Sequence, residues 1–350
     1  MNSKVLIVDD SALMRKFHKQ TLEQVGFITE LARNGEEGLA VLNSFAPDVI
    51  VLDINMPVMD GLECLKEIMR IRPTPVVMVS SLTEKGANET LEALALGAVD
   101  YIQKPNGQYS YNMGEASAKM AQKVKNAATI KLKSAIIRKN QQKISEEGRN
   151  TLIIKSPPFI SAAKRHDLIV IGVSTGGPNC LQVILPTLPA NFPTPIVIAQ
   201  HMPKRFTKVF AERLNSLCQL TVIEVIQKQK ILQGHIYIAQ GDGDIIIEKH
   251  GSELFAVPVE SDKNYLWHPS VSKLVESALV KVQANKLCCI QLTGMGNDGA
   301  QEMLKAFSKG ATTIAESQET AVVFGMPGDL VKKNGATHVA PNHKIASLLI

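Results

Sequence analysis

Short apolar runs alternate with amphipathic stretches through the first hundred residues of the chain. The apolar runs cover residues 4–8, 49–52, 76–79 and 101–102, and the stretches with helical spacing cover residues 11–24, 61–70 and 83–96. This alternation of strand and helix predicts a parallel sheet with helices on both faces. We therefore expect a doubly wound α/β domain, closed by a last helix with apolar residues at Met113, Ala116, Met120 and Val124.

The alternation resumes in the second half of the chain, after a stretch without clear periodicity. Apolar runs at residues 168–171, 195–199 and 287–292 predict buried strands, and a helical stretch begins at Asn179. The intervening segment is rich in Lys and Arg and contains Pro157-Pro158, as expected of a linker. We expect two α/β domains, at residues 1–128 and 164–350, joined by a basic linker at residues 129–163.

Composition narrows the functional classes. The 350 residues carry a formal net charge of +5, but the excess lies between Lys119 and Arg165, in and around the predicted linker, so we do not expect nucleic-acid binding. The five cysteines include no CxxC pair and indicate neither a disulfide framework nor a zinc site. No apolar run reaches the roughly 20 residues of a membrane span, and the N-terminus has no signal-peptide pattern. We expect a cytoplasmic protein that is not inserted in a membrane.

Polar residues follow the apolar runs of the first half, at the strand ends where parallel sheets bind ligands. They are Asp9, Asp10, Asp53, Ser80, Ser81 and Lys104. Three carboxylates at one edge of a sheet would repel one another unless a hard divalent cation lay between them, and Mg2+ suits such oxygen ligands. A site of this kind supports phosphoryl transfer to a carboxylate. Asp53, which ends the central strand, is the expected nucleophile.

Each of these residues also has a purely structural interpretation. Asp10 can cap the following helix, Asp53 can start a turn, and Lys104 can belong to a loop. Together, however, they resemble the receiver domain of two-component response regulators over residues 3 to about 128. The residues that carry the resemblance are Asp9-Asp10, Asp53-Ile54-Asn55-Met56-Pro57, Asp60-Gly61, Ser80 and Lys104-Pro105.

The resemblance implies a flavodoxin-like fold, a histidine kinase as phosphodonor and a role for each matching residue. Asp53 would be the phosphoacceptor. The implied Mg2+ ligands are Asp9, Asp10, Asp53 and the carbonyl of Asn55. The implied switch residues, which read the phosphoryl group and pass the change on, are Ser80, Lys104 and Tyr101.

In the second half, three polar residues follow predicted strands and can form a nucleophile, a base and an acid. Ser174 lies on the turn Gly172-Val173-Ser174-Thr175-Gly176-Gly177, His201 follows the strand at 195–199, and Asp298 follows the strand at 287–292. A nucleophilic serine requires a base and an acid that orients that base. Other residues fit equally well at this point: His268 as the base, and Asp242 or Asp244 as the acid or as parts of a hairpin turn. The turn at Ser174 can also be a phosphate cradle, although it matches neither GxGxxG nor GxSxG.

A second resemblance separates these alternatives. Segments 171–177, 200–202, 292–300 and 323–327 are similar to the catalytic domain of chemotaxis-type protein-glutamate methylesterases, across about residues 165 to 350. It implies Ser174 as nucleophile, His201 as general base and Asp298 as orienting acid. Backbone N–H groups around Thr175 and Met295 would form the oxyanion site. The chain departs from the family pattern at Gln240, Asp244 and Ser272, which we place outside the triad.

The combined resemblances imply a phosphorylation-regulated esterase of chemotaxis adaptation. Its substrates would be glutamyl methyl esters on chemoreceptors, with methanol as product, and some members of the family also deamidate receptor glutamines. The esterase reaction would need no cofactor. Two other classes fit the sequence less well. A response regulator whose output domain only binds, for example to DNA, is disfavoured because the second half has no helix-turn-helix pattern. A nucleotide-dependent oxidoreductase is disfavoured because the chain lacks a GxGxxG motif.

Overall fold

The computed structural model describes residues 3–81, 83–104, 113–130 and 166–350. The chain divides into two compact units, Met1–Ile153 and Ile154–Ile350, and each is described by itself. Except for its first two residues, the predicted linker at 129–163 lies outside the described residues. Among the described helices, none is long and apolar enough to cross a membrane.

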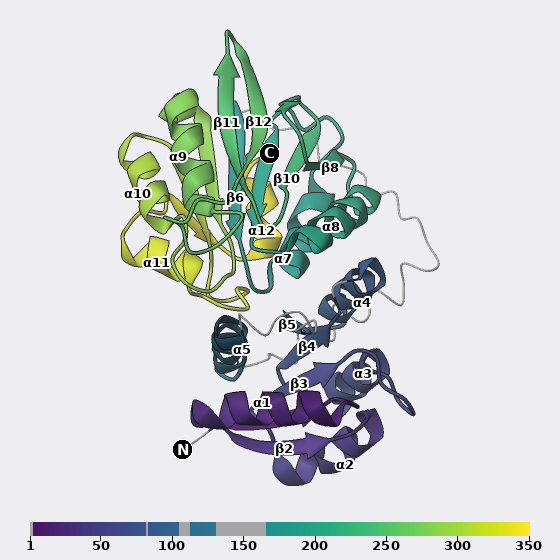
Figure 1. Ribbon diagram of the computed structural model, residues 1–350. Coiled ribbons are helices and arrows are strands. Elements are labelled where there is room, and N and C mark those ends of the chain that lie inside the picture. Colours follow the sequence, from purple (N-terminus) through teal and green to yellow (C-terminus); the bar gives the residue numbers. More distant parts are fainter. Residues whose placement is uncertain (1–2, 82, 105–112, 131–165) are drawn as a thin grey trace. The chain divides into compact units, whose positions relative to one another are not determined.

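The first unit is built on a parallel sheet (Figure 1). Within the described residues the sheet has five strands in the order β2-β1-β3-β4-β5. The strands are β1 (Lys4–Val8), β2 (Ile28–Ala32), β3 (Val49–Asp53), β4 (Val76–Ser80) and β5 (Asp100–Gln103). The helices are α1 (Ala12–Gln24), α2 (Gly35–Phe45), α3 (Gly61–Ile71), α4 (Glu84–Ala95) and α5 (Met113–Ala127). The α/β expectation is confirmed, but the apolar pattern did not predict β2 and α2.

The central strand β3 ends at the residue expected to carry the chemistry. All five residues of β3 are buried, because helices cover the parallel sheet on both faces. Asp60 caps α3 by accepting a hydrogen bond from the backbone N–H of Glu63 at 2.8 Å. A Cβ atom on Gly61 would lie 2.1 Å from the carbonyl oxygen of Asp53, so only glycine lets α3 begin so close to the end of β3.

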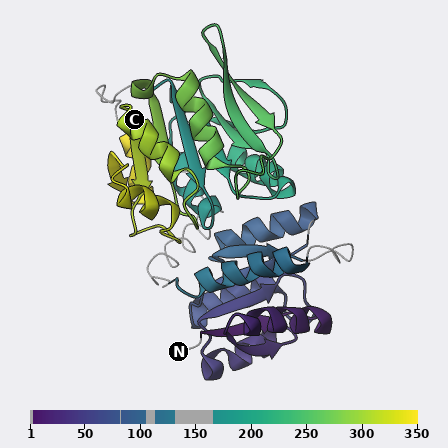
Figure 2. The ribbon, with the colours of Figure 1, turned by 60° about the vertical axis from the view of Figure 1, so that its left-hand side comes forward.

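The second unit has a larger parallel sheet and a small antiparallel one (Figure 2). Within the described residues, the parallel sheet has seven strands in the order β15-β14-β13-β6-β7-β10-β8, and the antiparallel sheet has the order β11-β12-β9. The strands of the large sheet are β6 (Leu168–Val173), β7 (Ile196–Gln200), β8 (Thr221–Val225), β10 (His235–Ala239), β13 (Leu287–Gln291), β14 (Thr312–Glu316) and β15 (His338–Ala340). Those of the small sheet are β9 (Gln229–Lys230), β11 (Asp244–His250) and β12 (Glu253–Val259).

The α-helices of the second unit are α7 (Gly177–Ile184), α8 (Lys204–Leu217), α9 (Val271–Lys281), α10 (Ala300–Ser308), α11 (Met326–Lys332) and α12 (Asn342–Ile345). In Figure 1, α9, α10 and α11 lie to one side of β6, and α7 and α8 lie to the other. A buried core joins the strands of the large sheet, the inner face of β11–β12 and α9. This confirms a second α/β domain, with an antiparallel sheet that the apolar pattern did not predict.

Candidate functional site

The carboxylates predicted to bind a cation do converge at one edge of the first sheet. Ligand oxygens of Asp9, Asp10 and Asp53 all lie within 4.8 Å of one another. Asp9 and Asp53 are fully buried, and one oxygen of each, Oδ2 of Asp9 and Oδ1 of Asp53, has no hydrogen-bond partner among the described residues. An all-oxygen set with unpaired buried oxygens fits Mg2+.

The charge of this cluster is compensated only in part. Burial, and then the charge of Asp53, raises the pKa of Asp9 to about 6. Burial also raises the pKa of Asp53, although the hydrogen bond and charge of Lys104 oppose the rise. Nζ of Lys104 lies 2.7 Å from Oδ2 of Asp53. A divalent cation at this edge would relieve the remaining repulsion between the carboxylates.

The other residues expected to act in the receiver lie at or near the ends of β3, β4 and β5. Asn55 lies directly beyond the end of β3, and its side-chain amide donates to Oε2 of Glu89 at 3.3 Å. Ser80 is at the end of β4, where its hydroxyl donates to the carbonyl of Gly86 and accepts from Thr90 at 2.7 Å. Tyr101 is buried in β5, and Nζ of Lys123 lies 4.8 Å from the centre of its ring.

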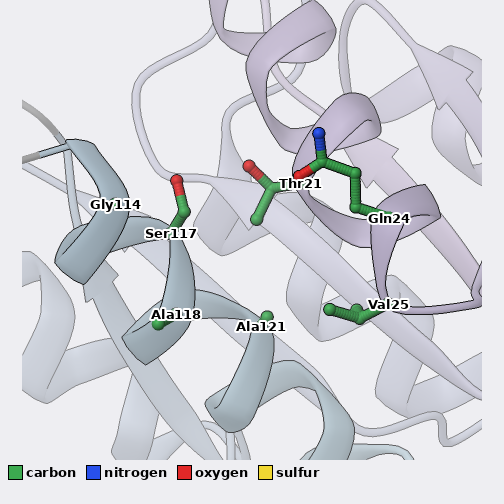
Figure 3. A pocket seen from close by; sticks show the side chains of 7 residues that line it. All are labelled: Thr21, Gln24, Val25, Gly114, Ser117, Ala118 and Ala121. Atoms are coloured by element: carbon green, nitrogen blue, oxygen red, sulfur yellow. The ribbon is translucent and has the colours of Figure 1, made fainter.

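A separate groove lies between α1 and α5 of the same unit (Figure 3). The groove has a volume of about 370 Å3, and its lining residues are Thr21, Gln24, Val25, Gly114, Ser117, Ala118 and Ala121. None of these side chains titrates or binds metals strongly. The groove therefore adds no chemistry to the carboxylate site.

In the second unit, the three predicted catalytic residues follow three neighbouring strands. Ser174 follows β6, His201 follows β7, and Asp298 lies on the loop after β13. The strand order places β6 between β13 and β7, at the point where the chain reverses its direction of travel across the sheet. Ligand sites of open α/β sheets form at this reversal.

His201 and Asp298 form a hydrogen-bonded pair. Nε2 of His201 lies 2.9 Å from Oδ2 of Asp298, and both side chains are almost fully buried. The other ring nitrogen, Nδ1, is buried and has no hydrogen-bond partner among the described residues. If Nε2 carries the proton that Asp298 accepts, Nδ1 keeps a free lone pair and can act as a base.

The start of α9 holds Asp298 in place. Its Oδ2 also accepts a hydrogen bond from the backbone N–H of Val271 at 2.7 Å, and its Oδ1 accepts from the N–H of Ser272 at 2.9 Å. Burial would raise the pKa of Asp298, but the hydrogen bond and charge of His201 and these N–H groups outweigh it and lower the pKa. The carboxylate therefore stays ionised, as an orienting acid requires.

Close packing fixes the turn that carries Ser174. The backbone N–H of Ser174 donates to the carbonyl of Thr293 at 3.0 Å. A Cβ on Gly177 would lie 2.0 Å from Oε1 of Gln200, and one on Gly294 would lie 2.8 Å from Cβ of Ser174. Glycine at position 177 lets α7 begin beside Gln200 of β7, and glycine at position 294 lets the loop after β13 approach Ser174.

Thr293 ties together the segments predicted to form the oxyanion site. Its hydroxyl donates to the carbonyl of Thr175 at 2.9 Å and accepts from the backbone N–H of Val323 at 3.0 Å. Thr175 and Met295 thus lie on two loops that share one linking side chain. A fixed pair of loops is a requirement for preorganised oxyanion donors.

Glu316, a buried carboxylate that the sequence did not lead us to expect, forms a hydrogen bond with the backbone of Thr293. Oε2 of Glu316 accepts from the backbone N–H of Thr293 at 2.8 Å, and Oε1 accepts from the hydroxyl of Thr320 at 2.8 Å. Glu316 is fully buried at the end of β14, and burial raises its pKa. The inspection of polar residues at strand ends could have found it, because Glu316 directly follows the apolar residues of β14.

The alternative histidine and the alternative acid form a pair of their own. Nδ1 of His268 lies 2.9 Å from Oδ1 of Asp244, which is buried. Asp242 lies on the exposed turn before β11, where it accepts from the backbone N–H of Lys204 at 3.2 Å. Ser270 links the two pairs, because its N–H donates to Asp244 and its hydroxyl to Asp298. Asp244 and Ser272, which we placed outside the triad, are therefore close neighbours of it.

Comparison with known proteins assigns each unit to a family. Residues 5–110 match the family described as response regulator receiver domain, and residues 169–349 match the family described as CheB methylesterase. A Rhodospirillum rubrum protein named protein-glutamate methylesterase/protein-glutamine glutaminase 3 is 49% identical over 352 residues, which cover 99% of this chain and 95% of that protein. A Thermotoga maritima protein named protein-glutamate methylesterase/protein-glutamine glutaminase is 39% identical over 353 residues, covering 99% and 97%.

A solved structure extends the likeness to the fold. The crystal structure of the Thermotoga maritima CheB methylesterase catalytic domain matches with a TM-score of 0.51 and 41% sequence identity, covering 53% of this chain and 97% of that one. The match in sequence runs through both units, and the order of receiver and catalytic domain is the one expected. The chain therefore belongs to the CheB methylesterase family, with a response regulator receiver domain ahead of the catalytic domain.

Proposed function

We propose that this chain is a cytoplasmic protein-glutamate methylesterase, regulated by phosphorylation of its receiver domain. Its substrates are glutamyl methyl esters on chemoreceptors. The observation that carries the proposal is the pairing of Nε2 of His201 with Asp298, with Nδ1 left unpaired, on a residue that follows the strand next to the one that ends before Ser174. A domain that only binds would have no need of an oriented base.

The reaction follows from this arrangement. The hydroxyl oxygen of Ser174 attacks the ester carbonyl while Nδ1 of His201 takes its proton, and Asp298 offsets the charge of the imidazolium. Backbone N–H groups near Thr175 and Met295 stabilise the oxyanion of the tetrahedral intermediate. The imidazolium then gives its proton to the leaving methoxide, so methanol departs and an acyl-enzyme remains. Water hydrolyses this intermediate by the same base and restores Ser174.

The same acyl chemistry applies to a glutamine side chain, with ammonia in place of methanol as the leaving group. Each relative described above carries both activities in its name. We propose glutamine deamidation of receptors as a second activity of the same three residues, without a cofactor for either reaction. Parallel assays of methanol and ammonia release with the same variants test this, because a shared nucleophile requires that both activities fall together.

In the receiver, we propose Asp53 as the phosphoacceptor, with a histidine kinase as donor. Asp9, Asp10, Asp53 and the carbonyl of Asn55 would hold Mg2+, and the unpaired oxygens of Asp9 and Asp53 support this. The cation would neutralise charge on the transferred phosphoryl group. Ser80, Lys104 and Tyr101 would read the modification. We further propose domain limits of 1–128 and 164–350 with a linker at 129–163.

The decisive experiment for the esterase replaces Ser174 with alanine. Ser174→Ala should abolish methanol release from methylated receptor, leaving at most the effects of binding and oxyanion stabilisation. His201→Ala should be comparably severe, and His268→Ala, the matched control on the second histidine, should be milder. Turnover above a few per cent in Ser174→Ala, or a greater loss in His268→Ala than in His201→Ala, would refute the assignment. Labelling by a serine-directed fluorophosphonate, absent in Ser174→Ala, would exclude a non-enzymatic output domain.

A further inference from the structure

Trp267 lies against the face of the His201 ring. The centres of the two rings are 6.0 Å apart and their planes differ by 9°. Offset, nearly parallel stacking at this separation is a favourable geometry for aromatic pairs. Trp267 is the single tryptophan of the chain and is partly buried. The contact uses the face of the imidazole and leaves its two nitrogens, at the ring edge, for hydrogen bonding and proton transfer.

The segment that carries Trp267 is anchored on both sides by Asp244. Downstream of Trp267, Oδ1 of Asp244 accepts from Nδ1 of His268 at 2.9 Å and from the N–H of Ser270 at 2.7 Å. Upstream, Oδ2 accepts from the N–H of Asp262 at 3.2 Å. The buried carboxylate of Asp244 thus fixes the backbone before and after Trp267. His268 is one of its hydrogen-bond partners.

Gly296 makes room for the indole on the loop after β13. A Cβ at this position would lie 2.9 Å from two carbon atoms of the Trp267 ring, and the backbone of Gly296 has a positive φ of 82°. The indole therefore packs on the loop that leads to Asp298 while it also contacts His201. Trp267 is therefore held between the loop after β13 and the ring of His201.

We propose that Trp267 is a positioning residue for His201. Its face holds the imidazole in the plane in which Nε2 meets Asp298 and Nδ1 stays available, and its π electrons offset the charge when the imidazole is protonated. The Asp244–His268 pair serves this purpose indirectly, by holding the segment of Trp267. The kinetic part of this inference rests on the proposed function, whereas the stack itself can be tested without any turnover.

The first test is spectroscopic and uses the full-length Ser174→Ala variant. An imidazolium in contact with indole quenches its fluorescence more strongly than neutral imidazole does, so Trp267 emission should rise with pH across the range, about pH 5 to 8, in which histidine side chains in general change their charge. Two histidines are candidate quenchers, His201 and His268. The charged group beside His201 is Asp298, and the one beside His268 is Asp244, which also forms an ion pair with Lys273.

Two further variants identify the quencher. Adding His201→Gln should remove the step in emission, whereas adding His268→Asn, which keeps a donor toward Asp244, should leave the step in place. A step that survives in the His201 variant, or that is lost with His268→Asn alone, would overturn the stack. Because these proteins lack the proposed nucleophile, the result does not depend on whether the chain is an esterase.

The second test is kinetic. Trp267→Leu should lower kcat for methanol release about fivefold to tenfold with little change in KM, the size of effect that loss of an aromatic pair produces. Trp267→Phe should recover most of kcat because it restores an aromatic face. Leu266→Ala, on the exposed neighbour, is the matched control and should stay within about twofold of wild type. Wild-type kcat in Trp267→Leu, or equal losses in the Leu and Phe variants, would overturn the positioning role. Residual turnover in Ser174→Ala would instead refute the proposed function and leave the emission result intact.

Discussion

Oδ2 of Asp298 faces Nε2 of His201, not Nδ1, so the ring nitrogen nearer the backbone is the one left to accept a proton in the proposed reaction. Asp298→Asn tests this geometry. The amide presents an N–H group to Nε2, favours the tautomer with the proton on Nδ1, and removes the basic lone pair. We expect kcat to fall by roughly three to four orders of magnitude while the fold persists.

The matched control for that variant is Asp242→Asn, on the exposed turn before β11. It makes the same chemical change outside the triad and should leave kcat within about twofold. Thermal unfolding of both variants separates a catalytic loss from a folding defect. Near-normal kcat in Asp298→Asn would assign orientation of His201 to another group.

A second prediction concerns the pH dependence of stability through Asp244. Burial would raise its pKa, but hydrogen bonds from His268, Ser270 and Asp262 outweigh this and lower the pKa below its usual 3.8. A carboxyl whose pKa is lower in the folded state stabilises the fold above its unfolded-state pKa, and loses that contribution as pH falls through the folded-state value.

Asp244→Asn should therefore reduce the free energy of unfolding by about 1 to 3 kcal/mol near pH 7, the cost of weakening hydrogen bonds to a buried charge. The difference from wild type should shrink as the pH falls below about 3.8, because Asp244 of the unfolded wild-type chain then takes up a proton while the folded carboxylate, with its lower pKa, does not. Denaturant unfolding at a series of pH values measures it. A difference that stays constant down to about pH 3 would contradict the lowered pKa of Asp244 in the folded state.

A third prediction concerns Glu316, the buried carboxylate that accepts a hydrogen bond from the backbone N–H of Thr293. Glu316→Gln can still accept from the N–H of Thr293 and should keep kcat within about threefold. Glu316→Ala leaves that N–H unpaired and opens a cavity, so we expect a stability loss of about 2 to 4 kcal/mol and a lower kcat. Similar outcomes for both variants would show that the side chain's hydrogen bonds do not brace the loop.

The fourth prediction concerns the receiver. Asp53→Asn keeps the shape of the side chain but loses the attacking oxygen and one metal ligand, so incorporation of phosphoryl groups from a small phosphodonor with Mg2+ should be abolished. Basal methanol release should be unchanged. Asp60→Asn, at the cap of α3, is the control and should still be phosphorylated. Full incorporation in Asp53→Asn would place the acceptor elsewhere.

The fifth prediction separates catalysis from its regulation. The core cluster of the second unit runs from Leu168 to Leu330 within that unit, so a chain of residues 164–350 should fold and release methanol alone. A phosphodonor should raise methanol release of the full-length protein and leave that of the 164–350 chain unaffected. Equal stimulation of both proteins would mean that the phosphodonor acts without the receiver.

Much of this fold was predictable because most central strands are buried on both faces and appear as continuous apolar runs. The strand β2 was missed because it is an edge strand, and Ile28 and Glu30 on it are exposed, so its apolar residues are interrupted. The antiparallel strands β11 and β12 were missed because we looked for the strand and helix alternation of a parallel sheet. Charged residues at Glu248 and Lys249 also interrupt the pattern of β11.

Only those residues of the candidate site that directly follow an apolar run could be predicted from the sequence. Ser174, His201 and Asp298 each follow an apolar run, but the choice between His201 and His268 came from a resemblance, since both are histidines in polar turns. The pairing of Asp244 with His268 depends on contacts between residues 24 positions apart. The stack of Trp267 on His201 spans a longer separation still, and no local pattern encodes it.

The placement of the three proposed catalytic residues on adjacent strands also bears on how such enzymes can diverge. Strands in one sheet lie about 4.8 Å apart whatever length of chain connects them. Between His201 and Asp298 the chain builds the whole antiparallel sheet and then returns to β13 beside β6. Insertions and deletions in the turns of that stretch that lie away from Asp244, Trp267 and the start of α9 can leave the spacing of the three side chains intact. Lineages can therefore change the length of these turns while they keep the three proposed catalytic residues on the same neighbouring strands.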